Sequence, residues 1–168
     1  PHTEEPKVFK IDTILQDILV FFSHELEIKN IILTTNWLEE NICIKGDPNQ
    51  LKQVLINIIK NAIDAIEAEG NIDITFQKED DRHIGIHIAD DGLGMKQETV
   101  NRIFQPFYTT KEKGTGLGMM ICEKIITEHK GKIEIDSTYG QGTIFSITLP
   151  ICTKEEKNKM LKKASENA

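Results

Sequence analysis

An apolar stripe at helical spacing runs through the chain between Asp47 and Gly70. Asp47 and Pro48 are typical of a helix start, because aspartate caps free backbone N–H groups and proline suits the first helical position. Gly70 is typical of a helix end. A helix with one apolar face must bury that face against a second layer of structure. The stripe consists of Leu51, Val54, Leu55, Ile58, Ile59, Ala62, Ala65 and Ile66.

The second layer is predicted to be a sheet, because short β-rich runs occur in pairs along the rest of the chain. Each pair is expected to form neighbouring strands joined by a turn: residues 31–35 with 42–44, 72–76 with 84–88, and 132–136 with 143–149. Helical spacing recurs from Ile11, with Asp12 as the expected cap and Asn30 as the expected end, and again over 96–103 and 117–130. The sequence predicts an α/β fold, a two-layer sandwich with helices on one face of a mixed, mostly antiparallel sheet.

Polar residues at both ends set the expected domain boundaries. Residues 1–10 carry two prolines and predict a linker, and residues 11–150 predict the folded domain. Residues 151–168, with five lysines and three glutamates after Thr153, predict a flexible tail. The length of 168 residues fits one domain with a tail, and since the chain does not start with Met we expect it to be a piece of a longer protein.

The composition excludes several classes of protein. A net charge of -7 argues against a nucleic-acid binder, which normally has a basic face. The three cysteines lie far apart, form no Cys-x-x-Cys pair, and predict reduced thiols in a cytosolic compartment. No apolar run reaches the roughly 18 residues that a membrane helix needs.

The long predicted helix carries a row of polar residues opposite its apolar stripe. Asn57, Asn61 and Asp64 stand at i, i+4 and i+7, and Gln53 extends the row. A solvated helix face is the ordinary interpretation. However, asparagine is a weak helix former, and amide oxygens suit Mg²⁺ beside phosphate oxygens, so a ligand-binding face is the alternative.

A first glycine-rich segment follows the strand predicted over 84–88. Asp90 ends that strand and leads into Asp91-Gly92-Leu93-Gly94-Met95. A carboxylate at a strand end can accept the exocyclic amine of adenine, and glycines let the backbone approach a flat purine. Asp-Gly is also a strong hairpin signal. Because a helix rather than a strand is predicted next, a ligand loop is favoured over a hairpin.

A second glycine cluster, Gly114-Thr115-Gly116-Leu117-Gly118, leads into a helix. Free N–H groups at a helix start bind phosphate. The cluster lacks the Gly-Lys-Ser/Thr ending of a P-loop, and no preceding strand gives it a Rossmann context. It therefore predicts a phosphate site of another kind.

The segment between the two glycine clusters, residues 103–111, is rich in aromatic residues. Phe104, Phe107 and Tyr108 predict a hinged lid held by apolar contacts, and Lys111 could reach a β- or γ-phosphate. The alternative is ordinary core packing by the aromatic rings, Phe104 above all, and a solvated lysine.

In this order, these motifs resemble the sensor histidine kinases. DPNQLKQVLINIIKNAIDAI is similar to their N box, IADDGLGM to the first glycine box, IFQPFYTTK to the F box, and GTGLGMMI to the second glycine box. GQGTIFSITLP resembles the closing hairpin, and the short lid resembles that of sporulation-type and nitrogen-regulatory kinases. The resemblance covers residues 11–150, and it implies the Bergerat ATP-binding fold with Mg²⁺ and ATP as ligands.

The resemblance also implies roles for residues. Asn61 would bind Mg²⁺ with Asn57 assisting, Asp90 would read the adenine amine, and Thr143 would support adenine through water. Asn57 and Lys111 would be the catalytic positions. The implied nucleotide-binding set is Asn57, Asn61, Asp64, Asp90, Gly92, Gly94, Met95, Phe107, Lys111, Gly114, Thr115, Gly116, Leu117, Gly118 and Thr143.

Position 57 separates kinases from hydrolases within the superfamily that the chain resembles. Its hydrolysing members carry a water-activating glutamate four residues before the Mg²⁺-binding asparagine, whereas Asn57 cannot act as a general base. The sequence therefore favours a kinase that passes the γ-phosphate to a histidine. An ATPase with an unusual base, or a nucleotide-binding module that only docks partners, are the alternatives.

The resemblance implies that the phosphate-accepting histidine lies on a separate dimerisation domain, from which phosphate passes to a response regulator. This chain is expected to be a monomeric cytoplasmic domain. The full-length protein is expected to be a homodimer, either cytoplasmic or anchored in the cell membrane. His24 is interpreted as an ordinary surface histidine, because Glu27-Ile28-Lys29 departs from the usual phosphoacceptor sequence, and His83 with His87 is not expected to bind metal.

Overall fold

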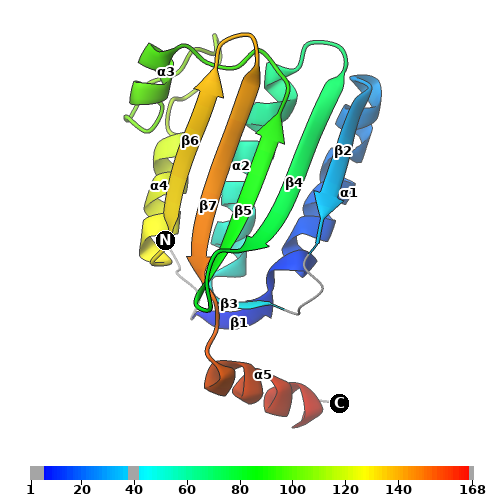
Figure 1. Cartoon of the computed structure of the whole chain (residues 1–168), viewed down its shortest axis with the longest axis vertical. Coiled ribbons are helices and arrows are strands. Elements are labelled where there is room, and N and C mark those ends of the chain that lie inside the picture. Colours follow the sequence, from blue (N-terminus) through cyan, green and yellow to red (C-terminus); the bar gives the residue numbers. More distant parts are fainter. Residues whose placement is uncertain (1–5, 38–41, 167–168) are drawn as a thin grey trace.

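A five-stranded sheet forms one layer of the molecule (Figure 1). The computed structural model describes residues 6–37 and 42–166. The strand order is β2-β4-β5-β7-β6, in which β2 runs parallel to β4 and the other neighbours are antiparallel. The strands are β2 (Ile31–Asn36), β4 (Gly70–Lys78), β5 (His83–Asp90), β6 (Lys132–Thr138) and β7 (Gly142–Pro150).

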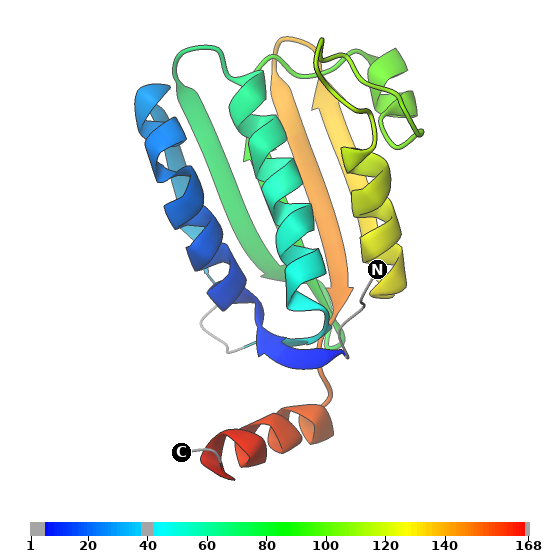
Figure 2. The same cartoon turned by 180° about the vertical axis from the view of Figure 1, so that it is seen from behind.

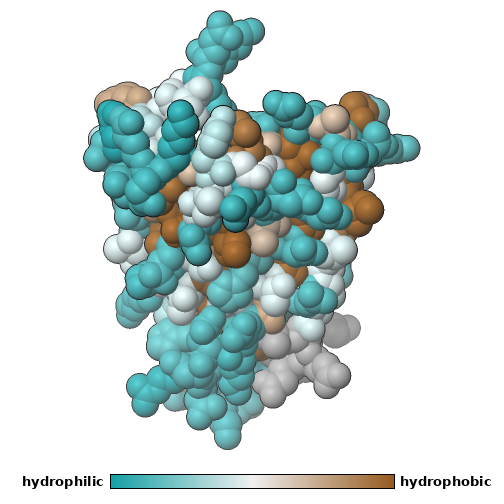
Figure 3. All heavy atoms as spheres, turned by 45° about the horizontal axis from the view of Figure 1, so that its top comes forward, coloured by the Kyte–Doolittle hydropathy of each residue, from teal (hydrophilic) through white to brown (hydrophobic). Residues whose placement is uncertain are grey.

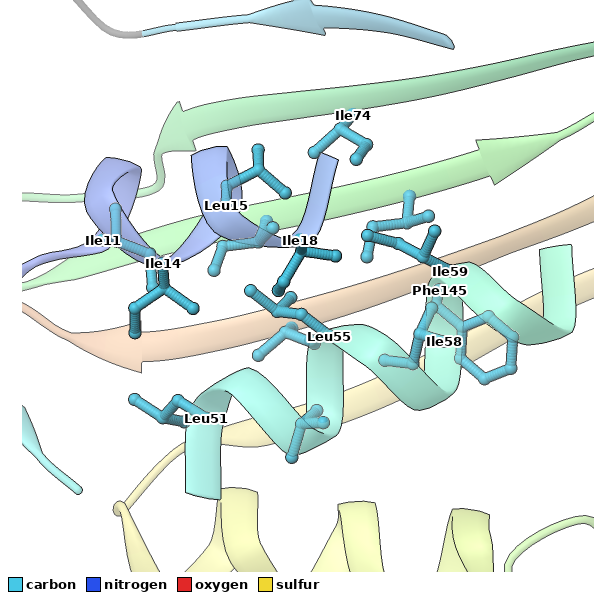
Figure 4. Close-up of a cluster of buried hydrophobic side chains, with 14 of the residues drawn as sticks. Ile11, Ile14, Leu15, Ile18, Leu51, Leu55, Ile58, Ile59, Ile74 and Phe145 are labelled. Atoms are coloured by element: carbon cyan, nitrogen blue, oxygen red, sulfur yellow. The ribbon is translucent and has the colours of Figure 1, made fainter. Parts of the chain in front are cut away.

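Helices cover one face of this sheet, as the reverse view in Figure 2 shows. They are α1 (Ile11–Ile28), α2 (Pro48–Ala65) and α4 (Gly118–Glu128). In Figure 4, buried side chains of α1 and α2 point toward Ile74 of β4 and Phe145 of β7. Each such buried side chain contributes about 1.5–3 kcal/mol. The predicted two-layer α/β sandwich with a mixed, mostly antiparallel sheet is confirmed.

The two later strand pairs are confirmed as antiparallel hairpins, β4 with β5 and β6 with β7. The short helix α3 (Gln97–Arg102) follows β5 at the predicted place. All three cysteines are free. Within the described part of the chain, no helix combines the length and apolar character needed to cross a membrane.

The pairing predicted for residues 31–35 and 42–44 is wrong. β2 pairs with β4, about 40 residues further along the chain, because it extends the main sheet beneath α1. β3 (Cys43–Gly46) instead pairs with β1 (Lys7–Lys10) in a separate two-stranded sheet. Part of the turn expected between the two runs, residues 38–41, lies outside the described residues.

Both chain ends contain more regular structure than a linker and a tail. β1 lies inside the predicted linker, of which residues 1–5 are outside the description, and α5 (Lys154–Glu166) lies inside the predicted tail. The start of α1 also differs: Lys10 is its cap residue, and Asp12 lies in its first turn. The expected end is close, because α1 stops at Ile28 and Asn30 adopts a positive φ of 52°.

α2 begins as predicted. The Asp47 carboxylate accepts hydrogen bonds from the N–H groups of Asn49 (2.9 Å) and Gln50 (3.2 Å). The helix ends at Ala65, before Gly70, which starts β4. Lys29, just after α1, places its ammonium on the carbonyl oxygens of Ile63 (2.7 Å) and Ile66 (2.8 Å). A cation there donates to carbonyl groups of the last turn and complements the negative end of the helix dipole.

We expect Lys29→Met to destabilise the fold by about 1–2 kcal/mol, because two charge-assisted hydrogen bonds to half-buried carbonyls are lost. Urea unfolding measures this difference. Lys52→Met is the matched control, since the exposed Lys52–Asp17 pair also joins α2 to α1 but is worth at most about 0.5 kcal/mol. Equal losses in the two variants would contradict a capping role for Lys29.

Candidate functional site

A cavity of about 440 Å³ lies between the second half of α2, the loop after β5 and the segment that leads into α4. This volume is within the range of roughly 300–1,000 Å³ that small-molecule sites occupy. Figure 3, with this end of the molecule turned forward, shows apolar surface between hydrophilic side chains. The lining includes these residues of the implied nucleotide-binding set: Asn57, Asn61, Asp64, Asp90, Gly94, Met95, Lys111, Gly114, Thr115, Gly116, Gly118 and Thr143.

The polar row on α2 forms one wall of the cavity. The Asn61 amide nitrogen donates to Met119 Sδ (3.2 Å), while its oxygen accepts from Lys111 Nζ (2.9 Å). The Asn57 amide nitrogen makes long contacts of 3.5 Å with Gly118 O and Cys122 Sγ. Both amides therefore use their nitrogen atoms toward α4, and their oxygen atoms are the groups suited to a cation.

Charged side chains surround Asp64 on the same wall. Lys111 Nζ lies 2.6 Å from Asp64 Oδ2, and Lys60 Nζ lies 3.0 Å from Asp64 Oδ1. Lys60 also contacts Glu25 Oε1 of α1 at 2.5 Å. Although burial opposes it, the ammonium groups of Lys111 and Lys60 hold the pKa of Asp64 below its usual value. Asp64 is therefore a carboxylate already engaged by two cations.

Asp90 is buried at the far end of the cavity, with only 9% of its surface exposed. It is the last residue of β5 and pairs with Thr143 of β7, and its Oδ1 accepts the Gly92 N–H (2.9 Å). Burial raises the pKa of Asp90 to about 6, against the lowering effect of the Gly92 hydrogen bond, and the charge of Asp91 raises it further. A carboxylate kept in such a place is a candidate for ligand recognition.

Thr143 belongs to a hydrogen-bonded group beside Asp90. Its hydroxyl lies 2.8 Å from Ser137 Oγ, which donates to Gly142 O (3.0 Å) and accepts the Met95 N–H (2.8 Å). These contacts tie the first glycine segment to the β6–β7 hairpin and fix the wall around Asp90.

The first glycine segment packs closely on its neighbours. Gly94 has a φ of +67°, and a Cβ there would lie 2.1 Å from Thr138 O. A Cβ on Gly92 would lie 2.6 Å from Ala65 O, and Leu93 N–H donates to that same carbonyl (2.9 Å). The segment is therefore held against the end of α2, and no side chain fits at either glycine.

The second glycine cluster leads into α4, whose first residue is Gly118. Gly116 has a φ of +69°, and a Cβ there would lie 2.4 Å from the Phe107 carbonyl carbon. Phe107 itself has a positive φ of 64° and is 76% exposed. The 103–111 segment is held by Tyr108, whose hydroxyl donates to Thr99 (3.1 Å), and by Phe104, which packs against the core.

Three residues of the implied set lie outside the cavity lining, namely Gly92, Phe107 and Leu117. Gly92 packs against α2, and Phe107 projects to solvent. Sequence reasoning missed several lining residues, because single threonines, a methionine and ordinary apolar residues carry no spacing signal. Lys60 had one weak signal, its position four residues before Asp64. The lining residues absent from the implied set are Lys60, Ala65, Leu93, Thr99, Ile103, Tyr108, Thr109, Thr110, Met119 and Phe145. Of these, Leu93 belongs to the predicted first glycine segment and Tyr108 to the predicted lid.

The three histidines considered in the sequence, His24, His83 and His87, lie outside the cavity lining and have local partners or face solvent. His24 is exposed on α1. His83 contacts Asp80 at 2.9 Å, and His87 contacts Ser146 and Glu79 on the sheet.

An α/β sandwich whose long helix, two glycine segments and buried strand-end aspartate enclose one cavity defines a nucleotide-binding domain of the Bergerat type. The chain belongs to the family described as "Histidine kinase-, DNA gyrase B-, and HSP90-like ATPase", whose model matches residues 46–153.

Within this family, the chain is similar to histidine kinases. Over 149 residues, 89% of this chain and 20% of the relative, the sequence is 40% identical to Sporulation kinase E of Bacillus subtilis (strain 168). The catalytic domain of histidine kinase ThkA has a TM-score of 0.79 at 33% identity, covering 88% of this chain and 96% of that one. The structure of ThkA in complex with the response regulator TrrA has a TM-score of 0.75 at 30% identity, covering 88% of this chain and 42% of that one. The chain thus resembles histidine kinase catalytic domains and spans about a fifth of the sporulation kinase.

Proposed function

We propose that this chain is the ATP-binding catalytic domain of a sensor histidine kinase, which transfers the ATP γ-phosphate to a histidine on a separate dimerisation domain. The observation that carries the proposal is a single cavity lined by the Asn57 and Asn61 amides, the buried Asp90 and both glycine segments. These groups match the three parts of the substrate: a base, a phosphate chain and its metal ion.

The base is recognised at the buried end of the cavity. Asp90 accepts a hydrogen bond from the exocyclic amine of adenine, a donor that guanine lacks at that position. Thr143, in the hydrogen-bonded group with Ser137, supports the base through water. Gly94 and Met95 border the same space, and glycine at position 94 lets the backbone approach a flat ring.

The phosphates are held at the other end. Backbone N–H groups of Gly116 and Gly118 and the positive end of the α4 dipole attract them. Gly118 has room for the approach, since the nearest atom to a Cβ there would be Asn57 Nδ2 at 3.7 Å. Lys111 supplies a positive charge from the lid.

The metal site implied by this function fits the residues present. Amide oxygens are hard ligands of the kind that Mg²⁺ accepts beside phosphates. Asn61, with Asn57 assisting, would hold Mg²⁺, which would neutralise charge on the β- and γ-phosphate oxygens.

The lining favours transfer over hydrolysis. Position 57 carries an amide, which cannot accept a proton from water. Among the described residues, the carboxylates that line the cavity are Asp64, engaged by Lys60 and Lys111, and Asp90, at the adenine end. The imidazole of an acceptor histidine is already a nucleophile, so positioning and charge neutralisation suffice for transfer.

The partners follow from the same function. The phosphorylated histidine is on the dimerisation domain of the longer protein, and a response regulator receives the phosphate, as the ThkA complex with TrrA suggests by similarity. We infer that this chain is a monomeric cytoplasmic domain of a homodimeric kinase that is either cytoplasmic or membrane-anchored. Its charge of -7 fits a protein that does not bind nucleic acid.

We expect the isolated chain to bind ATP with Mg²⁺ but to release free phosphate at roughly 10⁻³ s⁻¹ or slower, a rate typical of phosphoryl-transfer sites that lack an activating group. A continuous phosphate-release assay at saturating ATP measures it. Steady release near 1 s⁻¹ would favour the ATPase with an unusual base. Tight binding with no transfer to any histidine domain would favour a docking module.

A further inference from the structure

Lys111 crosses from the lid to α2 and contacts two residues there. Its Nζ lies 2.9 Å from Asn61 Oδ1 and 2.6 Å from Asp64 Oδ2. Its backbone is fixed at the same time, because its N–H donates to Thr109 Oγ1 (3.0 Å) and its carbonyl accepts the Gly114 N–H (3.1 Å). A short turn therefore presents this ammonium group to the wall of the cavity.

Asp64 is oriented toward Lys111 by a chain of alternating charges. Its second oxygen accepts from Lys60 (3.0 Å), and Lys60 is anchored by Glu25 of α1 (2.5 Å). Lys60 thus fixes the carboxylate in one orientation, so that Oδ2 remains available to the lid. Neither Lys60 nor Glu25 belongs to the nucleotide-binding set predicted from the sequence.

The contact with Asn61 conflicts with the metal site of the proposed function, on which this inference rests. Asn61 Oδ1 is the atom that suits Mg²⁺, yet here it accepts a hydrogen bond from an ammonium group. Two cations on one oxygen repel each other. Binding of metal and nucleotide at this wall therefore requires Lys111 to leave Asn61.

We propose that Asp64 is a positioning residue that latches the lid: before nucleotide binds, it holds Lys111 across the phosphate end of the cavity, where the ammonium contacts the Asn61 oxygen that would hold the metal ion. Lys60 and Glu25 hold the Asp64 carboxylate in the orientation that contacts Lys111. When Lys111 is displaced it becomes free to contact phosphate, and Asp64 stays neutralised by Lys60. The latch slows loading without contributing a contact to the bound nucleotide.

The test uses the full chain and its Asp64→Asn variant, with ADP carrying a ribose-linked fluorophore as the probe in Mg²⁺ buffer. Stopped-flow mixing gives association and dissociation rates. We expect association to become about five- to tenfold faster, because the open lid is populated more often once the charged contact is lost. Glu25→Gln, on the surface of α1, should show a smaller increase of roughly twofold.

Limited trypsin digestion gives a readout that does not depend on nucleotide. The lid ends at Lys111 and is followed by Lys113, and the Lys111 side chain is held against α2 while the latch is closed. Cleavage in the lid should be about five- to tenfold faster in Asp64→Asn, in step with association. Asp17→Asn is the matched control, because it breaks another α1–α2 ion pair, with Lys52, and should leave both rates unchanged.

The outcomes separate this proposal from the proposed function. If wild type binds the ADP probe and Asp64→Asn changes neither association nor lid cleavage, the latch is wrong and the nucleotide site stands. If Asp64→Asn only speeds dissociation, Asp64 is a direct ligand and the latch is also wrong. If wild type binds no ADP, the proposed function itself fails.

Discussion

Replacing Asp90 by asparagine is expected to weaken ADP binding about 10- to 150-fold at pH 8, because a charge-assisted hydrogen bond to adenine is lost. Isothermal titration measures the affinity. Asp91→Asn is the matched control: Asp91 hydrogen-bonds Asn71 outside the cavity lining and should leave ADP affinity nearly unchanged. Unchanged ADP affinity in Asp90→Asn would contradict the adenine assignment.

The pKa of about 6 for Asp90 gives this prediction a pH dependence. Adenine recognition needs the carboxylate, so wild-type affinity for ADP should fall about tenfold between pH 7 and pH 5 as Asp90 becomes protonated. Asp90→Asn should show no such fall. A parallel loss in both proteins would assign the pH dependence to another group.

The same substitution should stabilise the empty domain. The folded pKa of Asp90 lies above the unfolded value of 3.8, so the folded state binds the extra proton and stability falls as pH rises from about 4 through 6. At pH 8 the full cost is present, and Asp90→Asn should recover roughly 1–3 kcal/mol of unfolding free energy. Urea unfolding at pH 8 and pH 5 should show a larger gain at pH 8.

Replacing Asn61 by alanine is expected to remove the Mg²⁺ dependence of nucleotide binding. Wild type should bind ADP about 10- to 100-fold more tightly with Mg²⁺ than without it. Loss of a residue that supports a metal site typically lowers metal affinity by a factor of about 10 to 100. In Asn61→Ala the two affinities should be equal. Titrations with Mg²⁺ and with a chelator measure both.

Gln53→Ala is the control for the Asn61 variant, because Gln53 is exposed on the same row of α2 and lies outside the cavity lining. It should keep the full Mg²⁺ dependence. If Asn61→Ala also kept that dependence, the metal would be held by other groups, and the role proposed for the α2 amides would be wrong.

The sequence predicted those helices and hairpins that are specified by residues close together in the chain. The cap at Asp47, the apolar stripe of α2 and the two hairpins depend on neighbouring residues, and all were predicted apart from Ile63, which is fully buried in α2. The parallel pairing of β2 with β4 was not, because packing beneath α1 selects a partner about 40 residues away. β1 was missed because Lys7–Lys10 is short and polar, and it is a strand only through β3.

In the candidate site, too, the residues with a local sequence pattern were predicted, and those positioned by distant packing were not. The two glycine segments and the α2 row carry signals in their spacing, and most of these residues line one cavity. Glu25 carries no such signal and Lys60 only its spacing four residues before Asp64, since the role of both depends on α1 lying beside α2. The family resemblance placed Phe107 in the nucleotide-binding set, yet this residue has a φ of 64°, is 76% exposed and lies outside the cavity lining.

Transfer of the γ-phosphate to a histidine is the reaction that distinguishes this proposed kinase domain from an ATPase or a docking module. The most direct measurement incubates this chain with Mg²⁺ and γ-labelled ATP, with and without the histidine-bearing dimerisation domain of the same gene supplied in trans. We expect acid-labile, base-stable label on the added domain. Label that appears only as free phosphate, or that does not move although ATP binds, would contradict the proposed transfer.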